Sequence, residues 1–135
     1  TVLALKRLVD GRRATIMDFG VNLLFTSFWY EHRISPAQDY SSHHEDMVLY
    51  GPLCMNIDVV RENVSLPLLQ KGDRVVVHRV GAYNMTQWMQ FIQMRPNVVL
   101  IDTRGVVHLI RRREDVQTLN NQELVPEYLE AVKGS

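Results

Sequence analysis

Gly51-Pro52-Leu53-Cys54-Met55-Asn56-Ile57-Asp58 is a rigid turn that leads into the only cysteine of the chain and then into a carboxylate. A second turn, Gly81-Ala82-Tyr83, ends an apolar run and presents a tyrosine. Turns that hold two chemically useful side chains at strand ends predict a site built on a β scaffold. Neither side chain completes a reaction by itself, so the site needs groups from elsewhere.

Outward from these two turns, short strand-like runs separated by turn residues dominate the first hundred or so residues. Val2–Val9 alternates apolar with polar residues and ends at Asp10-Gly11, after which Arg13–Phe19 returns as a second strand. Val98–Asp102 and Val106–Arg112 flank a second hairpin turn. Many short strands joined by hairpin turns predict an all-β fold, a β-barrel or β-sandwich.

The segments between these hairpins are less regular. Val21–Tyr30 fits a helical turn or a strand, Ser35–His44 is typical of a surface loop, and Arg74–Val80 of a buried strand. Tyr83–Met94 fits a short helix or a strand, and in it Trp88, Phe91 and Met94 recur at a helical spacing that is typical of a core. From Arg113 onward the pattern becomes helical. We therefore expect residues 1–135 to form a single β domain with short helices, mainly near the C-terminus.

The composition argues against several kinds of binding partner and bears on the cellular compartment. Fifteen basic and fifteen acidic residues give a formal net charge of zero, which argues against nucleic-acid and acidic-membrane partners. No apolar stretch approaches the roughly 20 residues that span a bilayer. One cysteine cannot form an internal disulfide, which favours a reducing compartment, and we expect the cytoplasm.

Cys54 and Tyr83 are the main candidates for chemistry, and each has an ordinary alternative. A free cysteine is most often an inert, buried hydrophobe, but a cysteine directly after a turn can serve as a general acid or nucleophile if a partner tunes its pKa. The small residues before Tyr83 let a ligand, often a phosphate, approach the backbone while the phenol donates a hydrogen bond. The alternative is a tyrosine that caps a strand, with its ring in the core and its hydroxyl in water.

A metal site is not expected. His43-His44-x-Asp46 has suitable ligand types, but adjacent histidines in a strand or loop point in different directions, and no third ligand has a matching spacing. The pattern fits a solvated loop better. Asp18-Phe19-Gly20 lacks the further glycines of a phosphate-cradling loop.

Taken in order, these motifs resemble the C-terminal β domain of the fold-type III pyridoxal-phosphate decarboxylases, which include the ornithine, diaminopimelate and arginine decarboxylases. Gly51-Pro52-Leu53-Cys54 with Asp58 is similar to the family signature Gly-Pro-x-Cys-x-x-x-Asp. The other matching segments follow the family's order along nearly the whole chain: Val2–Lys6, Asp18–Asn22, Leu66-Pro67, Gly72-Asp73, Gly81-Ala82-Tyr83 and Pro96–Asp102.

The resemblance implies a pyridoxal 5'-phosphate enzyme of two domains. An α/β barrel that lies outside this chain would hold the cofactor on a lysine, and residues 1–135 would be the C-terminal β domain. The family forms homodimers with active sites at the subunit interface. There Cys54 would reprotonate the substrate's α-carbon after carbon dioxide leaves, and Tyr83 would bind the cofactor phosphate, both reaching the site from the partner subunit. The chain alone is not expected to be active.

Met55 and Asp58 are the candidate residues for binding an amino-acid-derived substrate. In ornithine and diaminopimelate decarboxylases the residue after the cysteine is acidic and binds the distal amine of the substrate, whereas this chain has Met55. A larger substrate that is neutral or anionic at that end fits better, as in the branch that acts on siderophore precursors or carrier-linked amino acids. Asp58 either contributes to substrate binding or orients the loop that presents Cys54.

Two alternatives remain open. A catalytically inactive homologue that works as a binding or regulatory module, like the antizyme-inhibitor type of relative, is compatible with Met55. A racemase would pair a similar β domain with the same barrel. The Gly-Pro-x-Cys signature favours a decarboxylase, because racemases use a tyrosine as the opposing acid or base.

Overall fold

The computed structural model describes residues 1–40 and 43–130 of the chain. It divides into two compact units, Thr1–Gln93 and Met94–Ser135. We refer to them as the N-terminal unit and the C-terminal unit and describe each by itself.

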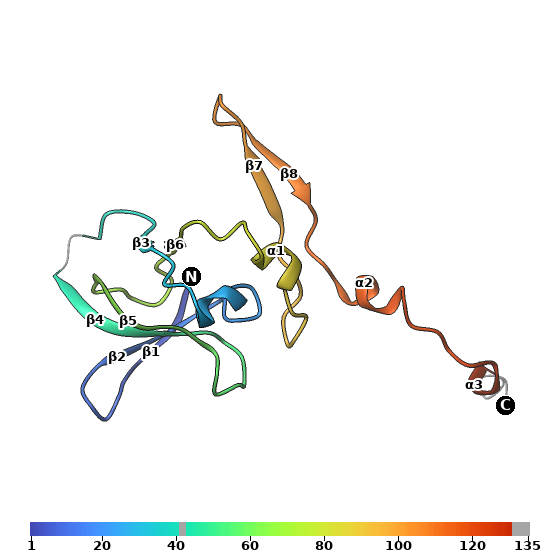
Figure 1. The fold of residues 1–135 in the computed structure, drawn as a ribbon, viewed down its shortest axis with the longest axis horizontal. Helices are drawn as coiled ribbons and strands as arrows, with labels where there is room; N and C mark the ends of the chain where they lie inside the picture. The colour runs from blue at the N-terminus through green and yellow to red at the C-terminus, as the bar shows by residue number, and fades with distance from the viewer. Residues whose placement is uncertain (41–42, 131–135) are drawn as a thin grey trace. The chain divides into compact units, whose positions relative to one another are not determined.

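A four-stranded sheet forms the centre of the N-terminal unit (Figure 1). Its strands are β1 (Val2–Arg7), β2 (Arg13–Met17), β4 (His44–Tyr50) and β5 (Val59–Pro67), in the order β1-β2-β4-β5. The first and last pairs are antiparallel, and β2 runs parallel to β4. The predicted hairpin at Asp10-Gly11 is confirmed, and Gly11 has the positive φ of 84° that such a turn requires.

Because β2 and β4 are parallel, the chain must cross between them, and this crossover carries two further elements. A 3₁₀ turn, η1 (Phe25–Phe28), comes first, and β3 (Ile34–Pro36) then pairs antiparallel with β6 (Val75–Val77). The predicted loop over Ser35–His44 is therefore wrong at its first two residues, and it is also wrong at His44, with which β4 begins. His44 and Asp46, which were expected in a solvated loop, lie on this strand. Pro36 occupies the last position of β3, in a two-stranded sheet where a proline without an N–H is tolerated. Residues 41–42 of that loop lie outside the described residues.

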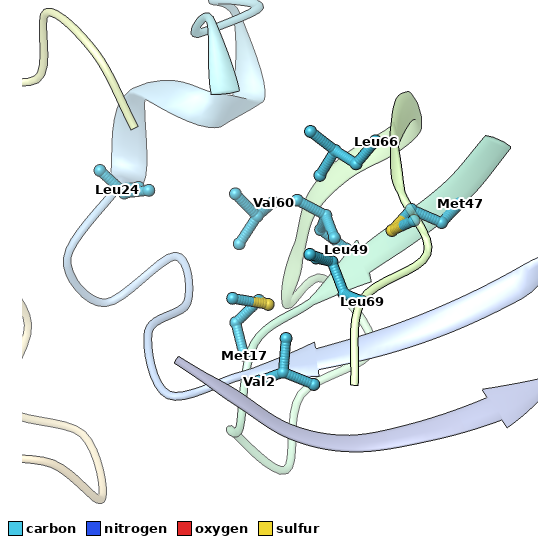
Figure 2. Close-up of a cluster of buried hydrophobic side chains, with 8 residues drawn as sticks. All are labelled: Val2, Met17, Leu24, Met47, Leu49, Val60, Leu66 and Leu69. Atoms are coloured by element: carbon cyan, nitrogen blue, oxygen red, sulfur yellow. The ribbon is translucent and has the colours of Figure 1, made fainter. Parts of the chain in front are cut away.

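The core of the N-terminal unit lies against this sheet. Figure 2 shows eight buried apolar side chains that pack together, from Val2, Met17, Leu24, Met47, Leu49, Val60, Leu66 and Leu69. Met47, Leu49 and Leu69 are fully buried, so the end of β4 and the chain that follows β5 are fixed by packing. The loop between β4 and β5, which contains Cys54, therefore starts and ends on strands whose side chains belong to the core.

One helical turn, α1 (Asn84–Gln87), follows Tyr83 directly. The expected core position of Phe91 is wrong, since its side chain is 42% exposed. The reason is that the helix ends at Gln87 and Trp88 is already extended, so the helical spacing no longer places the later residues on one face. Trp88 is half-buried and donates its Nε1–H to the backbone oxygen of Leu23 at 3.0 Å.

The C-terminal unit begins with the second predicted hairpin, which is confirmed. It consists of β7 (Val98–Ile101) and β8 (Val107–Arg111), followed by α2 (Val116–Asn120) and α3 (Glu127–Glu130). In the hairpin turn, the backbone N–H of Val106 and then the imidazole of His108 lower the pKa of Asp102 to about 2. The predicted all-β class with short helices is confirmed, and the short helices also include η1 and α1 of the N-terminal unit.

No helix within the described ranges has both the length and the apolar character needed to cross a membrane.

Candidate functional site

The carboxylate of Asp58 joins two turns that are far apart in the sequence. Asp58 is only 2% exposed, its Oδ1 accepts the backbone N–H of Val21 at 2.8 Å, and its Oδ2 accepts that of Leu53 at 2.7 Å. The backbone adds a bond from the Gly51 N–H to the Asp58 carbonyl at 2.9 Å. Both carboxylate oxygens are thus engaged inside the protein, as a buried charged group requires. Because both oxygens are buried and bonded to backbone N–H groups, this geometry favours Asp58 as a residue that orients the Cys54 loop over Asp58 as a substrate ligand.

This arrangement explains two glycines of the sequence motifs. A Cβ atom added at Gly20 or at Gly51 would overlap the Asp58 carboxylate, which lies directly against both backbones. Only residues without a side chain allow the carboxylate to approach that closely. The Asp58 clasp, by which we mean Gly20, Val21, Gly51, Leu53 and Asp58, therefore fixes the start of the Cys54 loop.

Cys54 lies in the loop between β4 and β5, directly after Leu53 of the Asp58 clasp. Its neighbours Leu53 and Met55 are buried and half-buried, whereas Cys54 itself is exposed. Among the described residues, no side chain or backbone group forms a hydrogen bond with its thiol. The structure thus exposes a free cysteine side chain on a loop whose backbone is bonded to a buried carboxylate.

A hollow of about 670 Å³ lies beside the same loop. Asn56 and Ile57 form part of its wall, and the opposite side carries Phe28, Trp29 and Tyr30 from the end of η1 and the chain after it. The lining of this hollow combines the three aromatic residues with aliphatic, polar and charged residues, and the hollow lies next to the Cys54 loop.

Tyr83 lines a different cavity of about 440 Å³, which we call the Tyr83 cavity. Its phenol is largely exposed, and the other walls include Thr26, His32, Arg33 and Arg79. Both Arg79 and Tyr83 have positive φ angles, 58° and 65°. Such backbone is unfavourable for residues with a side chain and is found mainly where function or tight packing imposes it.

A buried hydrogen-bond network fixes one wall of the Tyr83 cavity. The amide of Asn84 is oriented by two backbone bonds, from the Thr26 N–H to its Oδ1 at 3.3 Å and from its Nδ2 to the Val80 carbonyl at 3.1 Å. The Thr26 hydroxyl donates its single proton to the same Oδ1 at 2.9 Å. The 2.6 Å contact between Thr26 Oγ1 and His32 Nε2 must then be donated by the histidine. His32 is therefore held with a proton on Nε2.

From the sequence, Cys54 and Tyr83 are assigned to one site, and that assignment stays a prediction. Cys54 is not among the residues that line the Tyr83 cavity. His32, Arg33 and Arg79 were not identified from the sequence, because isolated histidines and arginines in polar stretches give no signal until β3 pairs with β6. Within the described residues, no group of three or more histidine, cysteine or carboxylate side chains could hold a metal ion.

Comparison with known proteins gives a consistent set of similarities. Residues 1–81 match the family described as "Pyridoxal-dependent decarboxylase, C-terminal sheet domain". The diaminopimelate decarboxylase of Streptomyces coelicolor is 35% identical over 133 residues, which cover 87% of this chain and 30% of that protein. A crystal structure of diaminopimelate decarboxylase from M. jannaschii is 27% identical and superposes with a TM-score of 0.84, covering 95% of this chain and 30% of that one. A co-complex of the same protein with L-lysine has a TM-score of 0.83, with the same identity and coverage.

The Asp58 clasp predicts a difference between two glycine substitutions. Gly51→Ala should lower the free energy of unfolding by about 2 kcal/mol or more, because the added methyl group overlaps the Asp58 carboxylate. Gly81→Ala is the matched control, since a Cβ there meets no atom within 4 Å, and it should change stability by less than about 0.5 kcal/mol. Chemical denaturation of both variants measures the difference. Equal effects would show that the carboxylate does not lie against Gly51.

Proposed function

We propose that this chain is one domain of a larger enzyme that decarboxylates an amino acid. The chain itself belongs to the pyridoxal-dependent decarboxylases, as their C-terminal sheet domain. The chain spans about 30% of the length of the curated relatives it matches, which supports a further domain in the parent protein. That domain would be the α/β barrel with the cofactor lysine. The observation that carries the proposal is the exposed Cys54 thiol on a loop clasped by Asp58.

The residues on the Tyr83 cavity fit the phosphate end of pyridoxal 5'-phosphate. The Tyr83 side chain is 62% exposed, and within the described residues its hydroxyl has no hydrogen-bond partner. The cavity wall around it carries cationic side chains. When bound, pyridoxal phosphate supplies the electron sink that lets an amino acid lose its carboxylate as carbon dioxide. Tyr83 would donate a hydrogen bond to the phosphate and so help to hold it in place.

Cys54 would act as the general acid of the reaction. Its Sγ–H would donate a proton to the α-carbon of the substrate once carbon dioxide has left, which requires a thiol that is exposed and held in a fixed direction. The Asp58 clasp supplies the fixed direction, because it ties the preceding Leu53 backbone to a buried carboxylate. A cysteine in this role must stay reduced, which supports the cytoplasm as the location.

Met55 would face the distal end of the substrate and determine its chemical class. It is half-buried directly after Cys54, and a thioether cannot pair with an ammonium group. The L-lysine co-complex of the M. jannaschii enzyme shows that a relative binds an amino acid with a distal amine. For this chain we propose a larger amino-acid-derived substrate with a neutral or anionic distal end, of the siderophore-precursor or carrier-linked type.

The parent enzyme would work as a homodimer, with Cys54 and Tyr83 contributed at the subunit interface. The β7–β8 hairpin supports a covering partner, because apolar side chains on both of its strands are about half exposed or more in the chain described here. They are Val99, Leu100, Ile101, Val107, Leu109 and Ile110. Exposed apolar surface of this kind is typical of an interface with another domain or subunit.

Replacement of the thiol tests the proton-donor role in the full-length protein. Cys54→Ala should keep the cofactor absorbance but slow product formation about 100-fold or more, or divert the product, because the general acid is lost. Steady-state kinetics and mass spectrometry of the product measure both effects. Asn56→Ala, two residues along the same loop, is the control and should retain most of the turnover. Unchanged kinetics and product in Cys54→Ala would refute the role. Absence of turnover in the unsubstituted full-length protein would favour an inactive binding module.

A second substitution tests the substrate class. Met55→Asp should raise kcat/KM for ornithine or lysine about tenfold relative to the unsubstituted enzyme, because a carboxylate can form a charge-assisted hydrogen bond with the distal ammonium. Met55→Asn is the matched control, of equal size to aspartate but uncharged, and should give a much smaller gain. If both variants behave alike, Met55 does not face the distal end of the substrate.

A further inference from the structure

We infer that Arg33 and Arg79 form, together with Tyr83, a binding site for a phosphate group. This inference rests on the proposed function for the source of the phosphate, which would be the cofactor. It adds two residues that neither the family motifs nor the sequence pattern identifies.

Strand pairing places the two arginines at the same end of one small sheet. β3 and β6 are antiparallel, and Ile34 pairs with Val77. Arg33 directly precedes this pair on β3, and Arg79 follows it by two residues after β6. The bond from the His78 N–H to the Arg33 carbonyl, at 2.9 Å, extends the pairing by one step toward the cavity. Both residues line the Tyr83 cavity.

The positive charge of these arginines is not balanced inside the cavity. Within residues 1–40 and 43–130, neither guanidinium group has a hydrogen bond or an ion pair with another residue. Glu31 also lines the cavity, but its Oε2 lies 3.0 Å from a guanidinium nitrogen of Arg61. Two guanidinium groups in a concave, partly apolar wall attract an anion more strongly than the same groups on a flat surface.

The walls of the cavity are held in place by buried hydrogen bonds. His32 is fixed by the network of Thr26 and Asn84, and Ser35 Oγ lies 2.8 Å from His78 Nε2. The left-handed backbone at Arg79 and at Tyr83 turns the chain sharply on either side of Gly81-Ala82. Little reorganisation would be needed to bring the two arginines and the phenol to a ligand.

The donor set fits a phosphate monoester better than a carboxylate. Each guanidinium offers two parallel N–H donors, and Tyr83 adds a hydroxyl, so the site can bind three or more oxygens of one group. A carboxylate has two oxygens and one negative charge, whereas a phosphate monoester has three terminal oxygens and a charge between −1.5 and −2. The two arginines would balance that charge.

The experiment compares pyridoxal phosphate with pyridoxal, which lacks the phosphate, as ligands of the cofactor-free full-length protein. Arg33→Gln and Arg79→Gln should each weaken pyridoxal phosphate binding about tenfold, while pyridoxal binding stays within about twofold. Arg74→Gln is the matched control. Arg74 is an exposed arginine that directly precedes β6 and does not line the cavity. It should leave both affinities unchanged.

Other outcomes overturn the inference. An equal loss for both ligands would indicate a structural role, and unchanged affinities with a raised substrate KM would assign the arginines to a substrate carboxylate. A parallel titration of the same proteins with inorganic phosphate needs no cofactor chemistry. If phosphate binds in an arginine-dependent way but the protein has no decarboxylase activity, the proposed function fails and the phosphate site stands. If Cys54-dependent activity is present without arginine-dependent phosphate binding, the site fails and the function stands.

Discussion

The buried carboxylate of Asp58 is the constraint on which the candidate site depends. It accepts two backbone N–H groups, from Val21 in the chain after β2 and from Leu53 in the loop after β4. A carboxylate in the protein interior is costly unless its oxygens are engaged, so the two turns and the carboxylate stabilise one another. Gly20 and Gly51 are glycines for this reason. The exposed position of Cys54 is then a consequence of the clasp and does not depend on contacts of the thiol itself.

The parts of the fold that depend on local patterns could be predicted from the sequence. Both hairpins, at Asp10-Gly11 and around Thr103-Arg104-Gly105, follow from turn residues between alternating runs, and the structure has them. The parallel pairing of β2 with β4 and the short β3–β6 pair could not be predicted, because they join segments distant in the sequence. The expected core position of Phe91 failed because the helix ends after one turn.

The same limit applies to the site. Turn residues and a family resemblance mark Cys54, Tyr83 and Asp58 as candidates in the sequence, and the roles assigned to them there stay predictions. The two cavities of the N-terminal unit described above could not be predicted from the sequence. The hollow beside the Cys54 loop and the Tyr83 cavity both arise where η1 and the chain that follows it meet residues more than twenty positions later. Such neighbours become visible only when strands far apart in sequence pair.

The most direct test of this account is amide hydrogen exchange at Val21 and Leu53. We expect both amides to be protected in the unsubstituted protein. In Asp58→Asn, whose side chain has only one acceptor oxygen, at least one of them should exchange about 100-fold faster, whereas the amide of Leu49 in the core of β4 should change much less. Equal exchange at Val21 and Leu53 in the two proteins, with Leu49 unaffected, would contradict the claim that the Asp58 carboxylate holds the Cys54 loop.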